Sequence, residues 1–339
     1  MQIDISDFVP SINKYVDQLI DRYESVEDPI FLQNVALHAQ DLPAVLRKGL
    51  LSFKLNETDG VCHVTGFPIH DEQIGPTPAH WRNKVTNNPT RREDFYLILC
   101  SHLLGDTVAW ATEQGGNLVH EVFPIKGNDG GQLGTSTDKL AWHTEDAFHP
   151  ERMDYVALLC LRNHDAVATT YASVDDLDLD NETKAQLFRP AYPFLPDEGN
   201  RADRELSPAE TSLVADLVKR SHERVLQMFS APEQVPALFG DAHAPYLRVH
   251  PHYIGDFGDD LPAFNAFERL KSAVNSALKD IVLRPGDLFF IDNFKSVHGR
   301  REIPGRFDGT DRWLKRAFVV RDLRKSRSLR TAASGRIVY

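Results

Sequence analysis

The sequence LAWHTEDAFHP occupies residues 140–150 and places two histidines and two carboxylates directly after an apolar lead-in. Side chains two residues apart on a β-strand share one face. A strand here turns His143 and Glu145 the same way, whereas Trp142 and Thr144 point to the opposite face. Such a pair directs one nitrogen and one anionic oxygen to a common point, which indicates half of a metal site. The alternative is an ordinary polar strand edge, because His-x-Glu pairs also occur by chance.

Strand-like segments dominate on both sides of this stretch. Apolar runs bounded by turn residues predict strands in GVCHVTGFPI (60–69), DTVAWAT (106–112), NLVHEVFPI (117–125), DYVALLCLR (154–162), AVATTYAS (166–173), YLRVHPHYI (246–254), DLFFIDN (287–293) and LKRAFVV (314–320). Helical spacing predicts helices over 5–25, 29–50, 91–105, about 203–230 and about 262–282. No regular βαβ alternation is present. The order predicts a mainly β protein with flanking helices (α+β), built on an antiparallel sandwich or jelly roll.

Composition and charge narrow the class of protein. The 339 residues carry a net charge of -11, which argues against nucleic-acid binding, and RDLRKSRSLR (321–330) is interpreted as a solvated basic segment. No apolar run reaches the roughly 20 residues needed to span a membrane, and the N-terminus lacks the pattern of a secretory signal. Three separated cysteines, Cys62, Cys100 and Cys160, are expected to be buried thiols in a reducing cytoplasm. We therefore expect a cytoplasmic protein, without a membrane or nucleic-acid partner.

A third metal ligand has to come from a distant part of the chain. His298 is the best candidate, because DLFFIDNFKSVHGR (287–300) reads as a buried strand that runs into a turn. Two histidines and one carboxylate form the facial triad of non-haem Fe(II) oxygenases, which leaves coordination positions open. Arg312 follows fourteen residues later, at the entry to the next strand. Its guanidinium can pair with the distal carboxylate of a small dianion that chelates the iron.

Three ordered blocks resemble one known family. WHTEDAFHPERMDYVALLCLRN (142–163), DLFFIDNFKSVHGR (287–300) and RFDGTDRWLKRAF (306–318) resemble the clavaminate synthase-like Fe(II)/2-oxoglutarate-dependent oxygenases, specifically the bacterial hydroxylases of free arginine and lysine. The similarity runs from about Val61 to the C-terminus. It implies a double-stranded β-helix, a cupin-like jelly roll, with flanking helices. We expect one oxygenase domain over 1–339, with a helical part at 1–60, and a core at 61–339 that includes the insert at 203–230 and the helix at 262–282.

The resemblance also implies roles for individual residues. His143, Glu145 and His298 correspond to the iron ligands, and Arg312 to the residue that holds the 2-oxoglutarate distal carboxylate. A hydroxyl contact to the same co-substrate falls on Thr169 or Thr170, of which only one can face inward on a strand. The remaining assignments concern the substrate: Arg316 for its carboxylate, Glu113 or the adjacent Gln114 for its α-amine, and His250 and His252 for its side chain.

One departure from the family pattern concerns the substrate side chain. The segment LRVHPHYI (247–254) has His250 and His252 where the arginine and lysine hydroxylases carry aspartates that pair with the cationic end. Histidine is a poor partner for a guanidinium and a good donor to a carboxylate or amide. This favours a neutral polar or acidic side chain, or a less usual amino acid, although acidic residues at 256, 259 and 260 keep a cationic side chain possible. A purely structural role of the two histidines also stays open.

The sequence thus predicts a dioxygenase that uses Fe(II), 2-oxoglutarate and O2 to hydroxylate an unactivated C–H bond, at Cβ or Cγ, of a free L-amino acid or derivative. Succinate and CO2 are the expected co-products. Oxidative cyclisation or desaturation, hydroxylation of a carrier-bound amino acid, and a non-catalytic metal-binding jelly roll are the alternatives. The expected partner is a small amino acid, and the sequence carries no indication of an oligomeric state.

Overall fold

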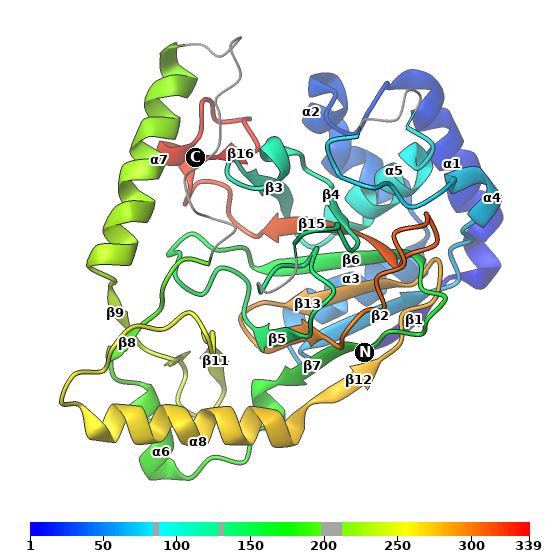
Figure 1. Ribbon diagram of the computed structural model, residues 1–339. Helices are drawn as coiled ribbons and strands as arrows, with labels where there is room; N and C mark the ends of the chain where they lie inside the picture. Colours follow the sequence, from blue (N-terminus) through cyan, green and yellow to red (C-terminus); the bar gives the residue numbers. More distant parts are fainter. Residues whose placement is uncertain (84–87, 129–131, 198–211) are drawn as a thin grey trace.

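The computed structural model describes residues 1–83, 88–128, 132–197 and 212–339. Within them, two main sheets lie at the centre and helices are arranged around them (Figure 1). The larger sheet has the order β1 (Gln2–Asp4), β2 (Val61–Thr65), β13 (Leu288–Asp292), β6 (Tyr155–Arg162), β15 (Trp313–Val320), β3 (Asp106–Trp110), β16 (Ile337–Val338), and β4 (His120–Val122) also pairs with β15. The smaller sheet has the order β12 (Lys279–Ile281), β7 (Thr169–Ser173), β14 (Ser296–Arg300), β5 (Leu140–His143).

The central position of β6 follows from its sequence. All eight residues of YVALLCLR are buried, as expected of a strand that is covered on both faces. It pairs antiparallel with β13 on one side and with β15 on the other. The two sheets contact each other through aromatic side chains, since the rings of Tyr171 on β7 and Phe289 on β13 lie 5.6 Å apart. Segments far apart in sequence are thereby brought into one core.

Two groups of helices cover the sheets. One group packs on the larger sheet and consists of α1 (Val9–Arg22), α2 (Pro29–His38), α3 (Ala44–Asn56) and α5 (Arg91–Ser101). The other group contains α6 (Asn181–Leu187) and α8 (Leu261–Ala277), which contact each other beside the smaller sheet (Figure 1). The indole of Trp142 on β5 donates to Asn275 of α8 over 2.8 Å. Trp142 therefore points to the face of β5 opposite to the one that carries His143, as predicted.

The remaining elements are short or peripheral. They are α4 (Asp71–Ile74), α7 (Ser212–Ser230), the pair β8 (Tyr192–Pro193) and β9 (Gln234–Val235), and the pair β10 (Leu238–Gly240) and β11 (Pro245–Leu247). No described helix is both long enough and apolar enough to cross a membrane. The three cysteines are buried free thiols, as expected.

Several predicted boundaries were wrong. The helix expected over 29–50 is two helices, because Pro43 precedes α3 and interrupts the pattern. The helix expected to reach 282 ends at Ala277, and β12 follows it. The strand expected over 246–254 is not continuous: it pairs at β11, and Ile254 forms an isolated bridge with Phe194. His298 lies on a strand, β14, and not in a turn. Of the predicted insert, the structure describes α7, and residues 203–211 lie outside the described residues.

Candidate active site

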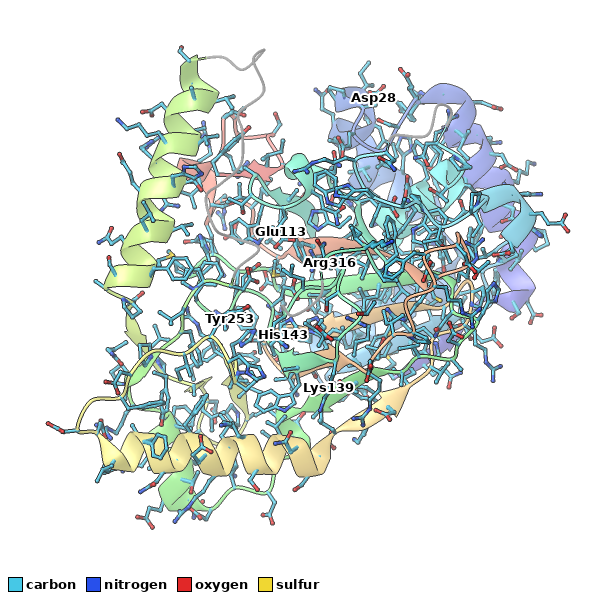
Figure 2. All side chains as sticks on the ribbon, in the orientation of Figure 1. Asp28, Glu113, Lys139, His143, Tyr253 and Arg316 are labelled. Carbon is cyan, nitrogen blue, oxygen red and sulfur yellow. The ribbon has the colours of Figure 1, made fainter. Side chains whose placement is uncertain are left out.

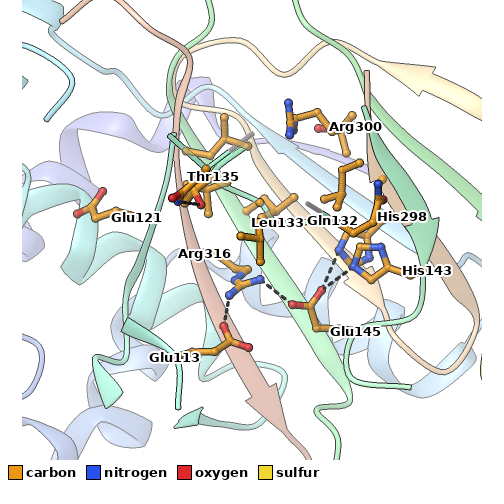
Figure 3. A pocket seen from close by; sticks show the side chains of 18 of the residues that line it. Glu113, Glu121, Gln132, Leu133, Thr135, His143, Glu145, His298, Arg300 and Arg316 are labelled. Carbon is orange, nitrogen blue, oxygen red and sulfur yellow. Dashed lines mark hydrogen bonds and ion pairs between the residues drawn. The ribbon is translucent and has the colours of Figure 1, made fainter. Parts of the chain in front are cut away.

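The two predicted histidine ligands face each other across a β-ladder. β14 pairs antiparallel with β5, and His298 is the direct partner of His143 in this register. Their ring centroids are 4.6 Å apart. Both Nε2 atoms approach the same oxygen of Glu145, at 3.3 Å from His143 and 3.1 Å from His298 (Figure 3). One ligand atom from each of the three residues lies within 4.8 Å of the others, so the predicted triad is assembled.

Glu145 reaches this point by another route than the one predicted. β5 ends at His143, and Glu145 lies in the turn that follows. The next residue, Asp146, has a left-handed backbone with φ of 48°, which Asp tolerates better than most residues. Strand alternation therefore does not place Glu145 beside His143. The turn does so, and the predicted shared face was correct for the wrong reason.

The chemistry of these three side chains fits a divalent metal ion. His143 Nδ1 lies 2.8 Å from the Ala141 carbonyl, which accepts its proton and leaves Nε2 as the acceptor nitrogen. Burial raises the pKa of Glu145, but the Arg316 charge and the two imidazoles outweigh it and hold this pKa well below its usual value. Two imidazole nitrogens and an ionised carboxylate, all largely buried, are the donor set that ferrous oxygenases use.

Arg312 forms a second feature of the site. Its side chain is 3% exposed, and Nη2 donates to Thr169 Oγ1 over 3.0 Å. Its Nε has no partner, and no described carboxylate forms an ion pair with this guanidinium. Burial lowers the pKa of Arg312 to about 10, so the group remains charged at neutral pH. A buried charge without a counter-ion is costly, which indicates that an anion binds here.

A cavity of about 240 Å³ joins the histidine–glutamate cluster to Arg312. Apolar side chains from three strands form part of its wall, namely Leu140, Leu158 and Leu314. Thr169 lines this cavity, whereas Thr170 is buried and does not, so the structure favours Thr169 of the two predicted hydroxyls. The cavity is long enough to border both Arg312, which immediately precedes β15, and Arg316, which lies on β15 four residues later.

Arg316 lies between two carboxylates. Its Nη1 donates to Glu145 Oε1 over 2.6 Å, and its Nη2 donates to Glu113 Oε2 and, over 2.9 Å, to His120 Nδ1. Figure 3 shows the resulting chain of contacts from Glu113 through Arg316 and Glu145 to the two histidines. Figure 2 shows Glu113, Arg316 and His143 in the central region of the molecule. The predicted carboxylate-binding arginine and the predicted amine-binding acid are thus paired with each other.

Comparison with known proteins identifies the family. The model described as "Taurine catabolism dioxygenase TauD, TfdA family" matches residues 87–318. The chain belongs to this family. Among curated TauD/TfdA-type relatives, enduracididine beta-hydroxylase of Streptomyces hygroscopicus is 41% identical over 98% of this chain and 98% of that protein. L-ornithine/L-arginine 3-hydroxylase of Catenulispora acidiphila is 38% identical over 95% of this chain and 94% of that protein.

More distant matches and solved structures agree with this family. Clavaminate synthase 2 of Streptomyces clavuligerus is 28% identical over 86% of this chain and 84% of that protein, which confirms the predicted resemblance. The non-heme iron oxygenase OrfP, solved with Fe, succinate and (3S)-hydroxy-L-Arg, superimposes with a TM-score of 0.92 at 36% identity, with 100% of both chains covered. This TauD/TfdA-family protein is an Fe(II)- and 2-oxoglutarate-dependent dioxygenase, as predicted.

Two residues that were predicted to contact the substrate, Gln114 and His250, form hydrogen bonds within the protein instead. The amide of Gln114 lines the cavity, but it is bonded through both Oε1 and Nε2 to the backbone of Glu121, at 2.8 Å each. His250 stacks on His143, with 5.3 Å between ring centroids, and its Nδ1 accepts the backbone N–H groups of residues 252 and 253. Neither His250 nor His252 is among the residues that line the cavity.

Sequence reasoning missed three charged residues of the cavity wall, namely Glu121, Asp197 and Arg300. Arg300 is 3% exposed and donates to the carbonyls of Ser136 and Asp138, which hold part of the loop over the cavity. Burial, followed by the charge of Arg312, lowers the pKa of Arg300 to about 9. Alternation would have put Arg300 on the face of His298 if β14 had been recognised as a strand. Asp197 also lines the cavity, and no spacing relative to the motifs identified it.

Proposed function

We propose that this dioxygenase hydroxylates a free L-amino acid with a cationic side chain, at Cβ or Cγ. The observation that carries the proposal is the single cavity that borders the triad, Arg312 and Arg316 together. It offers a site for a ferrous ion, a site for one anion beside Thr169, and a second guanidinium for another carboxylate. The names of the relatives supply the substrate class, since enduracididine, ornithine and arginine all carry a guanidine group or an amine in the side chain.

The proposed roles of the residues follow from their placement. When bound, the ferrous ion couples the oxidative decarboxylation of 2-oxoglutarate, which gives succinate and CO2, to insertion of one oxygen atom of O2 into a C–H bond. His143, Glu145 and His298 hold the ion. Arg312 and Thr169 hold the distal carboxylate of 2-oxoglutarate, because a buried guanidinium and a hydroxyl form a strong carboxylate site.

Substrate orientation falls to the other end of the cavity. Arg316 takes the α-carboxylate, which replaces Glu113 as a partner of Nη2. Glu113 then accepts the α-ammonium group, so an ion pair of the protein is exchanged for two ion pairs with the zwitterionic substrate. The apolar walls keep water away and fix the reacting carbon, which is the main task of a protein whose cofactor supplies the chemistry.

Asp197 is the proposed partner of the cationic side chain. It lines the cavity, and its charge acts on both His143 and Arg316, which places it near the metal cluster. The expectation of a neutral or acidic side chain rested on His250 and His252, and the cavity lining does not support that expectation. We also propose that the two sheets form a double-stranded β-helix and that 1–339 is one oxygenase domain.

The test is anaerobic reconstitution with Fe(II) and 2-oxoglutarate, followed by O2 and a panel of L-arginine, L-ornithine, L-enduracididine, L-lysine and L-asparagine. Succinate release that depends on a cationic amino acid, with a product heavier by one oxygen atom, is the expected result. A product lighter by two hydrogens would establish desaturation or cyclisation instead. Activity only on carrier-loaded amino acids, or metal binding without any succinate, would overturn the proposal.

A further inference from the structure

Asn293 contacts the metal-ligand turn without touching the cavity. It is fully buried and lies in the connection between β13 and β14, five residues before His298. Its Oδ1 accepts the backbone N–H of Glu145 over 2.7 Å, and its Nδ2 donates to the Glu145 carbonyl over 3.0 Å. Nδ2 also donates to the Met153 carbonyl, over 3.0 Å. The acceptor and one of the two N–H donors of this amide are therefore directed to the backbone of Glu145, and the other donor joins this turn to Met153.

The hydrogen bonds of Asn293 fix the backbone of Glu145, whereas a β-ladder fixes the backbone of the other two ligands. His143 and His298 are fixed by the pairing of β5 with β14. Glu145 lies beyond the end of β5, where no ladder holds its backbone. The neighbouring residue Thr144 is tied to Val249 through its backbone and hydroxyl, and Asp146 has the left-handed φ of 48°. At Glu145 itself, the N–H and the carbonyl both bond to Asn293.

We infer that Asn293 is a positioning residue that holds the carboxylate ligand in register with His298. This inference rests on the proposed metal site. Asn293 lies in the connection that leads from β13 to β14, and β14 carries His298, so the amide ties the turn of Glu145 to the segment that supplies the opposite histidine. Partners that orient metal ligands in this way typically contribute about 10–100-fold to metal affinity. Nothing in the sequence pattern around Asn293 identifies this role.

The chain offers a matched control for a general loss of stability. Asn163 is also buried, and its amide makes the same set of bonds in another turn: Oδ1 accepts from Val167 N, and Nδ2 donates to the carbonyls of Val167 and Leu283, each at 3.0 Å. Asn293→Asp and Asn163→Asp each keep one acceptor and replace the donating NH2 with an oxygen that faces two carbonyls. Both changes should lower the midpoint of thermal unfolding.

The experiment titrates wild type and the two variants with Fe(II) alone under anaerobic conditions, and records thermal unfolding in parallel. Asn293→Asp should weaken Fe(II) binding by about 10–100-fold, whereas Asn163→Asp should bind Fe(II) like wild type. Asn293→Ser serves as a milder variant if Asn293→Asp does not fold. Unchanged affinity in a folded Asn293 variant, or an equal loss in Asn163→Asp, would overturn the role of Asn293 alone. A wild type that takes up no Fe(II) would overturn the metal site as well.

Discussion

His298 stands directly opposite His143 in the antiparallel ladder between β14 and β5. The cross-strand register thus sets the distance between two ligands that are far apart in sequence, and Glu145 reaches the same point from a turn. The arrangement leads to a set of measurable expectations for the metal, the co-substrate and the substrate.

Loss of one histidine should abolish metal binding. In His298→Ala the remaining pair offers one nitrogen and one carboxylate, and Fe(II) affinity should fall by more than about 100-fold, because loss of outer partners alone costs roughly 10–100-fold. Anaerobic Fe(II) titration and O2-dependent succinate release measure the effect. His243→Ala, at an exposed position, is the control and should behave as wild type. Normal turnover of His298→Ala would contradict the assignment.

Arg312 and Thr169 should control the affinity for 2-oxoglutarate. Arg312→Met removes a buried charge partner, an effect of about 2–5 kcal/mol, so the KM for 2-oxoglutarate should rise by roughly 30-fold or more. Thr169→Val removes one hydrogen bond of about 1 kcal/mol and should raise this KM several-fold. Thr170→Val is the matched control, because the neighbouring hydroxyl does not line the cavity. An equal effect of both threonine variants would refute the placement of Thr169.

Glu113 should act on the amino acid and leave the co-substrate unaffected. Glu113→Gln keeps the shape of the side chain but loses the charge that pairs with an ammonium group, a contribution of about 1.5–3 kcal/mol. The KM for the amino acid should rise by about 10–100-fold. The KM for 2-oxoglutarate, measured with the same variant, should stay unchanged because Arg312 is untouched. Parallel increases in both constants would point to a general distortion of the cavity.

Asp197 should discriminate between cationic and neutral side chains. In Asp197→Asn the partner of the cationic group loses its charge, so kcat/KM for L-arginine or L-ornithine should fall by about 10-fold or more. Any residual activity on L-asparagine, which carries no side-chain charge, should not change. Kinetics on the three amino acids provide the comparison. A uniform decrease on all of them would remove Asp197 from the specificity determinants.

Glu93 should make the stability of the protein depend on pH. Burial raises its pKa from the usual 4.5 to about 7. A carboxyl whose folded pKa is raised favours the protonated form in the folded state, so the free energy of unfolding falls as pH rises from about 4.5 to 7. Glu93→Gln should therefore stabilise the protein at pH 8, by on the order of 3 kcal/mol, and much less at pH 4.5. Denaturant unfolding at both pH values measures the difference, and an equal effect at both would be inconsistent with a raised pKa.

Much of the fold was predictable because its strongest signals are local. The continuous apolar run of β6 and the periodic spacing of the helices are properties of single segments. β14 was missed because SVHGR carries polar residues and a glycine, and its burial depends on pairing with β5 and β7. Gly299 is required there, since a Cβ atom would lie 2.7 Å from the Leu140 carbonyl oxygen. Such a constraint exists only in the assembled sheet.

The site was predictable where a motif and a family pattern coincide, as for the triad residues and Arg312. The pairing of Arg316 with Glu113 could not be predicted, because it depends on β15 lying beside β4 and on the turn after β3. The same holds for Arg300, whose guanidinium bonds to backbone carbonyls of a distant loop. Contacts of this kind leave no periodic trace in the sequence.

Arg312 immediately precedes β15 and Arg316 lies on it, and this has a consequence for the regiochemistry. β15 is held between β6 on one side and β3 with β4 on the other, so it cannot slide, and four residues of extended chain span at most about 13 Å, less where the bulge at Trp313 and Leu314 interrupts the strand. On the proposed roles, this rigid interval fixes how far the α-carboxylate of any substrate sits from the co-substrate anion. A substrate longer by one methylene group would therefore extend at its distal end, and the carbon that is oxidised, counted from the carboxylate, would stay the same.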